Sequence, residues 1–510
     1  MLSEPTTART SLAPLPAFAL PASWTSAAGR IATALFLLVA LQTLYSVPKL
    51  TWDLAAPGRP ALGMAFGIAV ALAAALGLWA CRARLASGFQ AFGDRLAAIP
   101  RLRWLAMAIA AGIVLRLAWV LLFPAPFTSD GKAYYDLAAR LAQGLSYQTP
   151  KAEWAAWPPG FPFVLLALFR LLGVGPAAVT TANLLLFAGT ILIVYALARR
   201  FGEGTARVAT LLLALWPNLI ASAGAATKEM VIVFLLPVVL LLWLQAGGQA
   251  SPRRAAVTRF TAGIVFGYAT LTQPAVMLMV GVFGAWELLR RAPLHRVAGR
   301  LLLLGLGMAV VILPWTLRNQ RVLGQPVLVS TNGGSVFYRA NNPRATGGWI
   351  PDGERSLRGY DELTADRLGY RWGKEWIREN PGEFLLLSLR KQVLFLGDDA
   401  VSVYETLKRG LGRQGLVYAL AKLAANAYWW GIWALVLAAF LARRTLDATR
   451  RPETLLFLLT ILYFWAIDSV FESGARHHLP LVGLLAILAA SLAETPSVSP
   501  SPRSGEGARG

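Results

Sequence analysis

Carboxylates and cations gather in a few short segments of a chain that is otherwise apolar. The segment 128–141, Thr-Ser-Asp-Gly-Lys-Ala-Tyr-Tyr-Asp-Leu-Ala-Ala-Arg-Leu, contains Asp130 and repeats its apolar and charged residues with a helical period. A carboxylate at that position can cap the helix that follows, lie in its first turn where the helix dipole favours it, or accept a proton as a general base. Spacing alone favours the cap. Lys132, Asp136 and Arg140 are four residues apart, which is typical of a solvated ion-pair ladder.

A metal centre is the less favoured chemistry. The sequence contains no His-Glu-x-x-His motif and only one cysteine, Cys81, which also excludes an internal disulfide. His477 and His478 are adjacent, so on a helix they point in different directions. The pair Asp398-Asp399 is interpreted as solvated loop acids, with a divalent metal site as the alternative. We therefore expect no metal and no other cofactor.

The elements that must position these residues are transmembrane helices. The chain has 510 residues, of which 56% are hydrophobic and 15% charged. Apolar runs of about 17–25 residues, the length that spans a bilayer as a helix, recur throughout. They predict an all-α integral membrane protein with 12 spans, near 31–47, 61–80, 104–123, 176–198, 208–223, 229–246, 258–273, 275–289, 299–317, 418–442, 454–471 and 479–493.

The distribution of basic residues predicts the orientation. Five short loops, 82–103, 199–207, 247–259, 290–300 and 443–453, carry 19 Lys and Arg, against 4 in the alternate short loops. Basic loops face the cytoplasm. We therefore expect both termini in the cytoplasm, and we attribute much of the net charge of +22 to topology and lipid headgroups rather than to nucleic acid.

Two long loops are then predicted on the outer face, which would be periplasmic or extracellular in a bacterium. The expected organisation begins with a disordered tail (1–27), two additional N-terminal helices with a basic loop (28–103), and a core (104–317) that contains a catalytic first outer loop at 124–175. A large outer loop (318–417), the C-terminal helices (418–493) and a second tail (494–510) follow. Besides the helix after Asp130, apolar segments at 161–172 and 384–396 predict further interfacial helices.

Several motifs resemble a known family. Asp130 in Ser-Asp-Gly-x-x-Tyr and the segment 158–162, Pro-Pro-Gly-Phe-Pro, follow a span that carries Arg116. Later come Pro-Trp-Thr-Leu-Arg-Asn, Ser-Thr-Asn-Gly-Gly, Asn-Asn-Pro and Arg-His-His-Leu-Pro, at 314–319, 330–334, 341–343 and 476–480. In order and topology they resemble the GT-C superfamily of polytopic glycosyltransferases. Within it they are similar to bacterial relatives of the dolichyl-phosphate-mannose–protein mannosyltransferases (glycosyltransferase family 39), whose broader group includes the lipid A aminoarabinose transferases.

The resemblance, which covers about 104–493, implies a polyprenyl-phosphate sugar donor in the membrane. It also implies an inverting transfer to a hydroxyl acceptor, with Asp130 as the general base. The acceptor would be a protein, lipid A or another cell-envelope glycan. An acidic outer loop and the lack of a Walker-type phosphate loop agree with a lipid-linked donor. The alternative function is a lipid or glycan flippase or transporter without transferase chemistry.

Such a reaction needs cations for the phosphate that leaves. The candidates are Lys132, Lys151, Lys228, Arg318, Arg476 and, inside a span, Arg116. For Lys228 and Arg318 the alternative to phosphate binding is snorkelling, in which the side chain extends from the end of its span to place its charge in water. Supporting roles are expected for Tyr134, Tyr135, Glu229, Glu472 and His477.

Overall fold

The structure is a computed structural model, and it describes residues 21–442, 446–449 and 451–494. Most of both predicted tails lies outside the described residues, but the first helix begins at Ala22, within the segment 1–27 that was expected to be disordered. No strand occurs in the described ranges. The all-α, multi-span membrane fold expected from the sequence is therefore confirmed.

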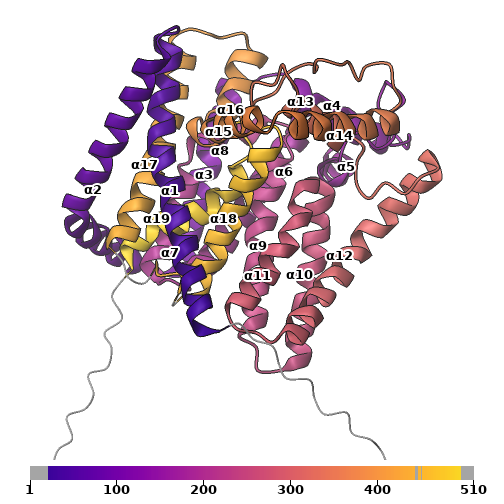
Figure 1. Cartoon of the computed structure of the whole chain (residues 1–510). Coiled ribbons are helices and arrows are strands. Elements are labelled where there is room, and N and C mark those ends of the chain that lie inside the picture. The colour runs from indigo at the N-terminus through magenta and orange to yellow at the C-terminus, as the bar shows by residue number, and fades with distance from the viewer. Residues whose placement is uncertain (1–20, 443–445, 450, 495–510) are drawn as a thin grey trace, which may run out of the picture.

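A bundle of helices forms the body of the molecule (Figure 1). It consists of α1 (Ala22–Ala55), α2 (Pro60–Ala97), α3 (Arg101–Leu122), α6 (Pro176–Ala198), α7 (Glu203–Ala214), α8 (Pro217–Ala221), η1 (Ser222–Gly224), α9 (Glu229–Gly247), α10 (Pro252–Thr272), η2 (Pro274–Met279), α11 (Val280–Leu289), α12 (Leu294–Leu323), α17 (Leu416–Ala442), α18 (Pro452–Val470), η5 (Leu479–Leu481), α19 (Val482–Ala490) and η6 (Ser491–Ala493).

The predicted number of 12 spans is not confirmed. Among the described residues, eight helices are long and apolar enough to cross a membrane, or nine if α7 and α8–η1 are one span bent by 50°. The bend falls at Trp216-Pro217, where a proline removes a backbone donor. The runs near 275–289 and 479–493 form only shorter apolar helices, 274–289 and 479–493.

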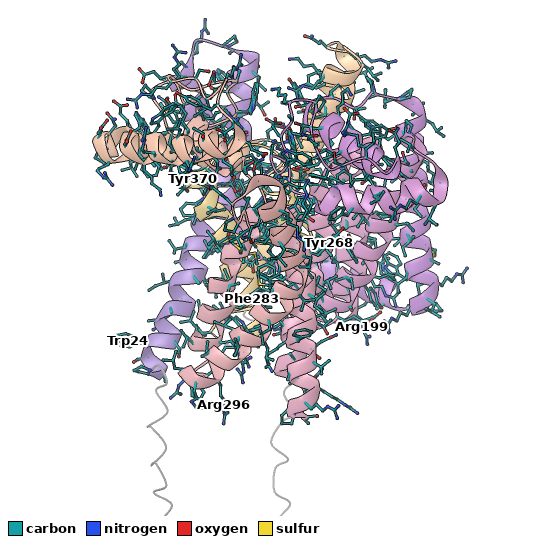
Figure 2. The ribbon with its side chains drawn as sticks, turned by 90° about the vertical axis from the view of Figure 1, so that its right-hand side faces the viewer. Trp24, Arg199, Tyr268, Phe283, Arg296 and Tyr370 are labelled. Atoms are coloured by element: carbon teal, nitrogen blue, oxygen red, sulfur yellow. The ribbon has the colours of Figure 1, made fainter. Side chains whose placement is uncertain are left out.

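A second group of elements lies across one end of the bundle. It comprises α4 (Ser129–Ala142), α5 (Gly160–Leu172), α13 (Gly333–Ala340), α14 (Glu362–Glu379), α15 (Pro381–Gly397), α16 (Val401–Val403) and the π-helix η3 (Tyr404–Gly410). Figure 2 shows Tyr370 at this end, and Trp24, Arg199 and Arg296 at the other. All of these elements belong to the two long outer loops predicted from the sequence, so we call this the outer end.

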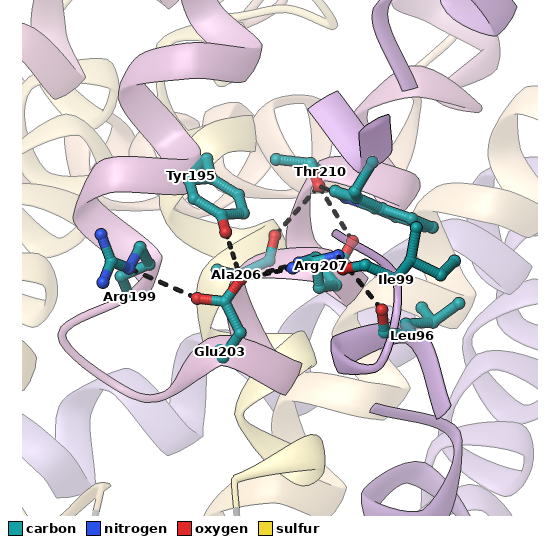
Figure 3. Close-up of polar contacts among 9 residues, drawn as sticks. Leu96, Ile99, Tyr195, Arg199, Glu203, Ala206, Arg207 and Thr210 are labelled. Atoms are coloured by element: carbon teal, nitrogen blue, oxygen red, sulfur yellow. Dashed lines mark hydrogen bonds and ion pairs between the residues drawn. The ribbon is translucent and has the colours of Figure 1, made fainter. Parts of the chain in front are cut away.

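Buried polar contacts hold helices together at the end opposite the outer end, which we call the inner end (Figure 3). Arg207 on α7 is almost fully buried, and it donates to Glu203 at 2.8 Å and to the carbonyls of Leu96 and Ile99 at 3.1 and 2.9 Å. Carbonyls at a helix C-terminus have no partner within the helix. Arg207 therefore joins the end of α2 to α7, and the two N-terminal helices pack as part of the bundle.

Candidate active site

Asp130 lies in the first turn of α4, at the outer end. This helix is amphipathic, and it buries Tyr134, Leu137 and Ala138. The residue before it, Ser129, has a φ of 49°, which a non-glycine residue rarely adopts and which concentrates at functional sites. Asp130 does not cap the helix, because no side-chain cap bond is formed at its N-terminus. The interpretation of Asp130 as the N-cap is therefore wrong, but the carboxylate does lie in the first turn, where the helix dipole favours a negative charge.

The Asp130 carboxylate instead pairs with Arg476, which is 346 positions later in the chain. The Arg476 Nη1 donates to Asp130 Oδ2 at 2.6 Å, and each side chain keeps about a third of its surface exposed. Burial disfavours the charged carboxylate, but the Arg476 guanidinium outweighs it and holds the pKa of Asp130 below its usual value. Asp130 is thus an ionised, partly accessible carboxylate that a substrate hydroxyl can approach.

Further charges surround this pair. Lys228 precedes the first turn of α9 and Glu229 lies within it, and Glu472 is buried on the same turn as Arg476. Burial works against the charge on Arg476, yet the carboxylates of Asp130, Glu229 and Glu472 raise its pKa. Burial lowers the pKa of Lys228, against the attraction of Glu229. The site therefore concentrates both signs of charge around one carboxylate.

A cleft of about 550 Å³ opens beside Asp130 and Arg476. Its walls come from the outer part of α1, the start of α4, the loop at Gly348-Trp349, the end of α15, η3, α17 and the turn 472–477. Glu472 and His477, expected in supporting roles, line it. A second cavity of about 70 Å³ shares Asp130 and Arg476 and is lined by Glu229.

Four charged side chains of the cleft were missed by the sequence analysis, and one of them is Asp53 on α1, which pairs with Lys49. Arg409 bonds Glu405 at 2.7 Å on η3, and Lys422 on α17 bonds Asp398 at 2.8 Å. Burial raises the pKa of Glu405, against the pull of Arg409. Lys422 had a detectable signal, because it is a cation inside the predicted span 418–442, where charge is expensive unless it is functional or paired.

Five of the six candidate phosphate ligands do not line the cleft, and Lys228, beside Glu229 at the start of α9, is one of them. Lys132 pairs with Asp136 at 2.6 Å on an exposed face, as the ladder interpretation expects, and Lys151 is exposed. Arg318 donates to the carbonyls of Trp154 and Tyr147, both at 2.6 Å. These bonds tie the first outer loop to the end of α12.

Arg116 is the fifth candidate outside the cleft. It is buried between α3 and α7, donates to the carbonyls of Gly112 and Ala214, and lies 3.6 Å from the ring centre of Phe187. No ion pair to an acid is formed at Arg116 in the described part of the chain. Its guanidinium serves the packing of two spans, and the geometry gives no support for a phosphate contact.

The two tyrosines of α4 support the site by packing. Tyr134 contacts the rings of Trp157 and Phe161 edge-on, with ring centres 5.2 and 5.8 Å apart. Tyr135 packs on Phe169 of α5. These contacts hold α4 against α5, and α5 is the helix expected after Pro-Pro-Gly-Phe-Pro. The position of Asp130 thus depends on an aromatic cluster within the first outer loop.

The expectation that Asp398 and Asp399 are solvated loop acids is wrong for Asp399. Its carboxylate is fully buried and accepts bonds from Trp216 at 2.7 Å and Asn218 at 2.6 Å. Asp398 instead points to Lys422 in the cleft. Within the described ranges, no group of three or more His, Cys, Asp or Glu side chains could hold a metal ion.

Part of the chain matches a known protein family. Residues 156–316 match the family model of the dolichyl-phosphate-mannose-protein mannosyltransferases. The expected resemblance is confirmed. The matched segment includes α5, α9 and the residues Lys228 and Glu229, whereas Asp130 and Arg476 lie outside it. A comparison with curated proteins gives no match.

The solved structures that match this chain include an oligosaccharyltransferase from Archaeoglobus fulgidus in the apo form, with a TM-score of 0.47 and 14% identity over 76% of this chain and 50% of that one. Another is ArnT from Cupriavidus metallidurans bound to undecaprenyl phosphate, with a TM-score of 0.40 and 17% identity over 78% of both chains. The chain thus spans about half the length of the archaeal enzyme.

Proposed function

We propose that this protein is a membrane glycosyltransferase that moves a sugar from a polyprenyl phosphate to a hydroxyl acceptor at its outer end. The observation that carries the proposal is the cleft in which ionised Asp130 stands beside Arg476, with Arg409 and Lys422 in the same walls. Besides Asp130 the cleft contains three cations, two of them paired with Glu405 and Asp398, and such groups suit a displacement that removes a proton and releases a phosphate. The match to the mannosyltransferase family supports the same chemistry.

In the proposed reaction the acceptor oxygen attacks the anomeric carbon and inverts it. The bond from that carbon to the phosphate oxygen breaks, its electron pair stays on the phosphate, and Asp130 takes the proton from the acceptor hydroxyl. The phosphate is a good leaving group, so no general acid is needed, in contrast to glycoside hydrolysis. The acceptor and the leaving group stand on opposite faces of the sugar. The cations that line the cleft, Arg476, Arg409 and Lys422, are the proposed phosphate ligands, whereas Lys228 lines neither cavity and contributes its charge beside the Asp130–Arg476 pair.

The first experiment identifies the donor. Purified protein should transfer sugar from a polyprenyl-phosphate glycoside and leave nucleotide sugars unused, and activity should survive a chelator. Turnover of a nucleotide sugar with none from the lipid-linked form contradicts the proposal. A flippase without transferase chemistry would instead move the lipid-linked sugar across proteoliposomes with no new glycosidic bond. A survey of the proteins, lipid A and envelope glycans that lose sugar when the gene is deleted would identify the acceptor.

We also propose that the protein lies in the bacterial inner membrane with its outer end toward the periplasm and both termini in the cytoplasm. The native Cys81 is exposed and must first be replaced. In that background, Arg358→Cys should react with a membrane-impermeant thiol reagent in intact cells, and Arg254→Cys should not. Both side chains are exposed, so the two results depend on the side of the membrane alone. Labelling at 254 with protection at 358 would reverse the orientation.

A further inference from the structure

His478 ends the turn that carries Arg476, and it is fully buried outside the cleft. Its Nδ1 lies 2.6 Å from the carbonyl oxygen of Phe395, and its Nε2 lies 3.1 Å from Asp399 Oδ1. A carbonyl only accepts, so Nδ1 carries a hydrogen. One proton then lies between Nε2 and Oδ1, and the bond forms whichever of the two atoms holds it.

Asp399 extends this contact to two other parts of the bundle. Its carboxylate accepts from Trp216 and Asn218 beside the bend between α7 and α8, and its backbone N–H donates to Asn426 on α17 at 2.8 Å. Trp429 of the same helix stacks on the imidazole, with ring centres 4.2 Å apart. The imidazole of His478 is therefore held on both edges and on one face.

A pair of this kind is expensive to bury. Replacing a buried ion pair with packed apolar residues is often neutral or stabilising, so stability alone gives a weak reason for His478 and Asp399. The mechanism proposed above uses neither of them. The turn between 472 and 478, however, has to present Arg476 to a carboxylate at the start of α4, with which it shares no secondary structure.

The turn is anchored at both ends, with Arg476 between the anchors. At the first end, the backbone N–H of Ser473 donates to the Gly347 carbonyl at 3.0 Å and its hydroxyl donates to the Lys391 carbonyl at 2.8 Å. At the second end the anchor is His478, two residues after Arg476. Since His477 points the other way, to Asp468 at 2.5 Å, His478 is the side chain that joins this end to the bundle core.

We infer that the buried His478–Asp399 pair positions Arg476, and through it Asp130, for sugar transfer. The catalytic consequence depends on the proposed function, whereas the positioning itself does not. The pair touches neither the cleft nor the reacting atoms, so it acts by fixing the backbone of the turn. A displacement of about 1 Å in a catalytic arrangement can lower a rate by roughly 100-fold.

Two substitutions of His478 separate its two bonds. In His478→Gln the amide nitrogen reaches the position of Nε2 and keeps the bond to Asp399. In His478→Asn it takes the position of Nδ1, keeps the bond to Phe395 and loses Asp399. We expect kcat to fall about 10- to 100-fold in His478→Asn, and by a much smaller factor in His478→Gln. Asp399→Ala, which removes the acceptor for Nε2, is the second variant if His478→Asn does not fold.

Glu203→Gln is the matched control for stability, because Glu203 is half of a partly buried ion pair at the inner end (Figure 3). It should lower the melting temperature while leaving kcat unchanged, measured well below that temperature. Cryo-electron microscopy in nanodiscs then gives a readout independent of activity. The Arg476–Asp130 contact of 2.6 Å should open in His478→Asn and persist in Glu203→Gln.

The outcomes distinguish the two proposals. If the contact stays at its wild-type length in His478→Asn and Asp399→Ala, the positioning role is wrong whatever the activity. If the contact opens and kcat is unchanged, the proposed effect of the pair on sugar transfer is wrong. If Arg476 moves as expected but the wild-type protein transfers no sugar from a polyprenyl phosphate, the proposed function fails and the positioning role stands.

Discussion

The substitution Asp130→Asn tests the central residue with little disturbance of the fold. Asparagine keeps the size of the side chain, and its amide oxygen still accepts from Arg476, which donates at 2.6 Å in the native protein. Both side chains are about a third exposed, so the lost charge pairing should reduce stability by only about 0–1 kcal/mol. The variant should therefore fold and insert normally.

The rate should respond very differently. Removing a general base lowers a rate by roughly 10²- to 10⁴-fold, so kcat should fall by that factor. Affinity for undecaprenyl phosphate should stay the same or increase, because Asp130→Asn removes a negative charge next to Arg476. Arg476→Ala should have the opposite effect and weaken binding, since it deletes the cation. The opposite signs of the two changes separate a base from a phosphate ligand.

Single-turnover transfer from a radiolabelled polyprenyl-phosphate glycoside, together with equilibrium binding of undecaprenyl phosphate, measures both effects. Asp136→Asn is the matched control, because it makes the same chemical change on the same helix at a carboxylate paired only with exposed Lys132. It should retain near wild-type kcat. Transfer at the wild-type rate by correctly inserted Asp130→Asn would refute the reasoning and direct attention to Glu405, the other carboxylate that lines both cavities.

Three further predictions concern pH and packing. Because Arg476 holds the pKa of Asp130 below its usual value of about 3.9, kcat/KM should lose its base only below about pH 4, and the stability from this pair should be lost as the pH falls through the lowered pKa. Gly334→Ala should lower the melting temperature strongly, since a Cβ there would lie 1.8 Å from the Asp366 carbonyl oxygen, whereas Gly382→Ala, with nothing within 4 Å, should not. Glu362→Ala should reduce the free energy of unfolding by about 2–3 kcal/mol and expose the first outer loop to protease, because the carboxylate accepts three bonds there.

Local sequence patterns predicted the elements better than their partners. The helix after Asp130, the helix after Pro-Pro-Gly-Phe-Pro and the one at 384–396 all appear, as α4, α5 and α15. Each was visible as an apolar face or run within about 15 residues, which is the range over which helical periodicity can be detected. The predicted number of 12 spans is not confirmed, and at 275–289 and 479–493 the reason is that an apolar run of 15 residues satisfies composition without providing the length of a membrane-crossing helix.

Pairing across the chain could not be predicted in this way. Arg476 was one of six candidate cations, and nothing within its own turn indicates that its partner is Asp130 rather than a lipid phosphate. Arg318 looked equivalent, but its guanidinium is used by the carbonyls of Tyr147 and Trp154. Which of two similar arginines faces the cleft is decided by the packing of segments more than a hundred residues apart.

Local sequence also did not show which charged residues are buried, and two adjacent aspartates illustrate this. Asp398 and Asp399 have the same local composition, yet the first meets Lys422 in the cleft and the second is enclosed by Trp216, Asn218 and His478. A loop residue becomes buried when helices from distant segments close over it. In such a bundle the apolar pattern of the sequence indicates which helix surfaces face lipid or pack together. The polar network that shapes the site depends on the packing of helices from distant segments, so it forms only when the bundle has assembled. Mutations in that network should therefore alter catalysis without touching a substrate.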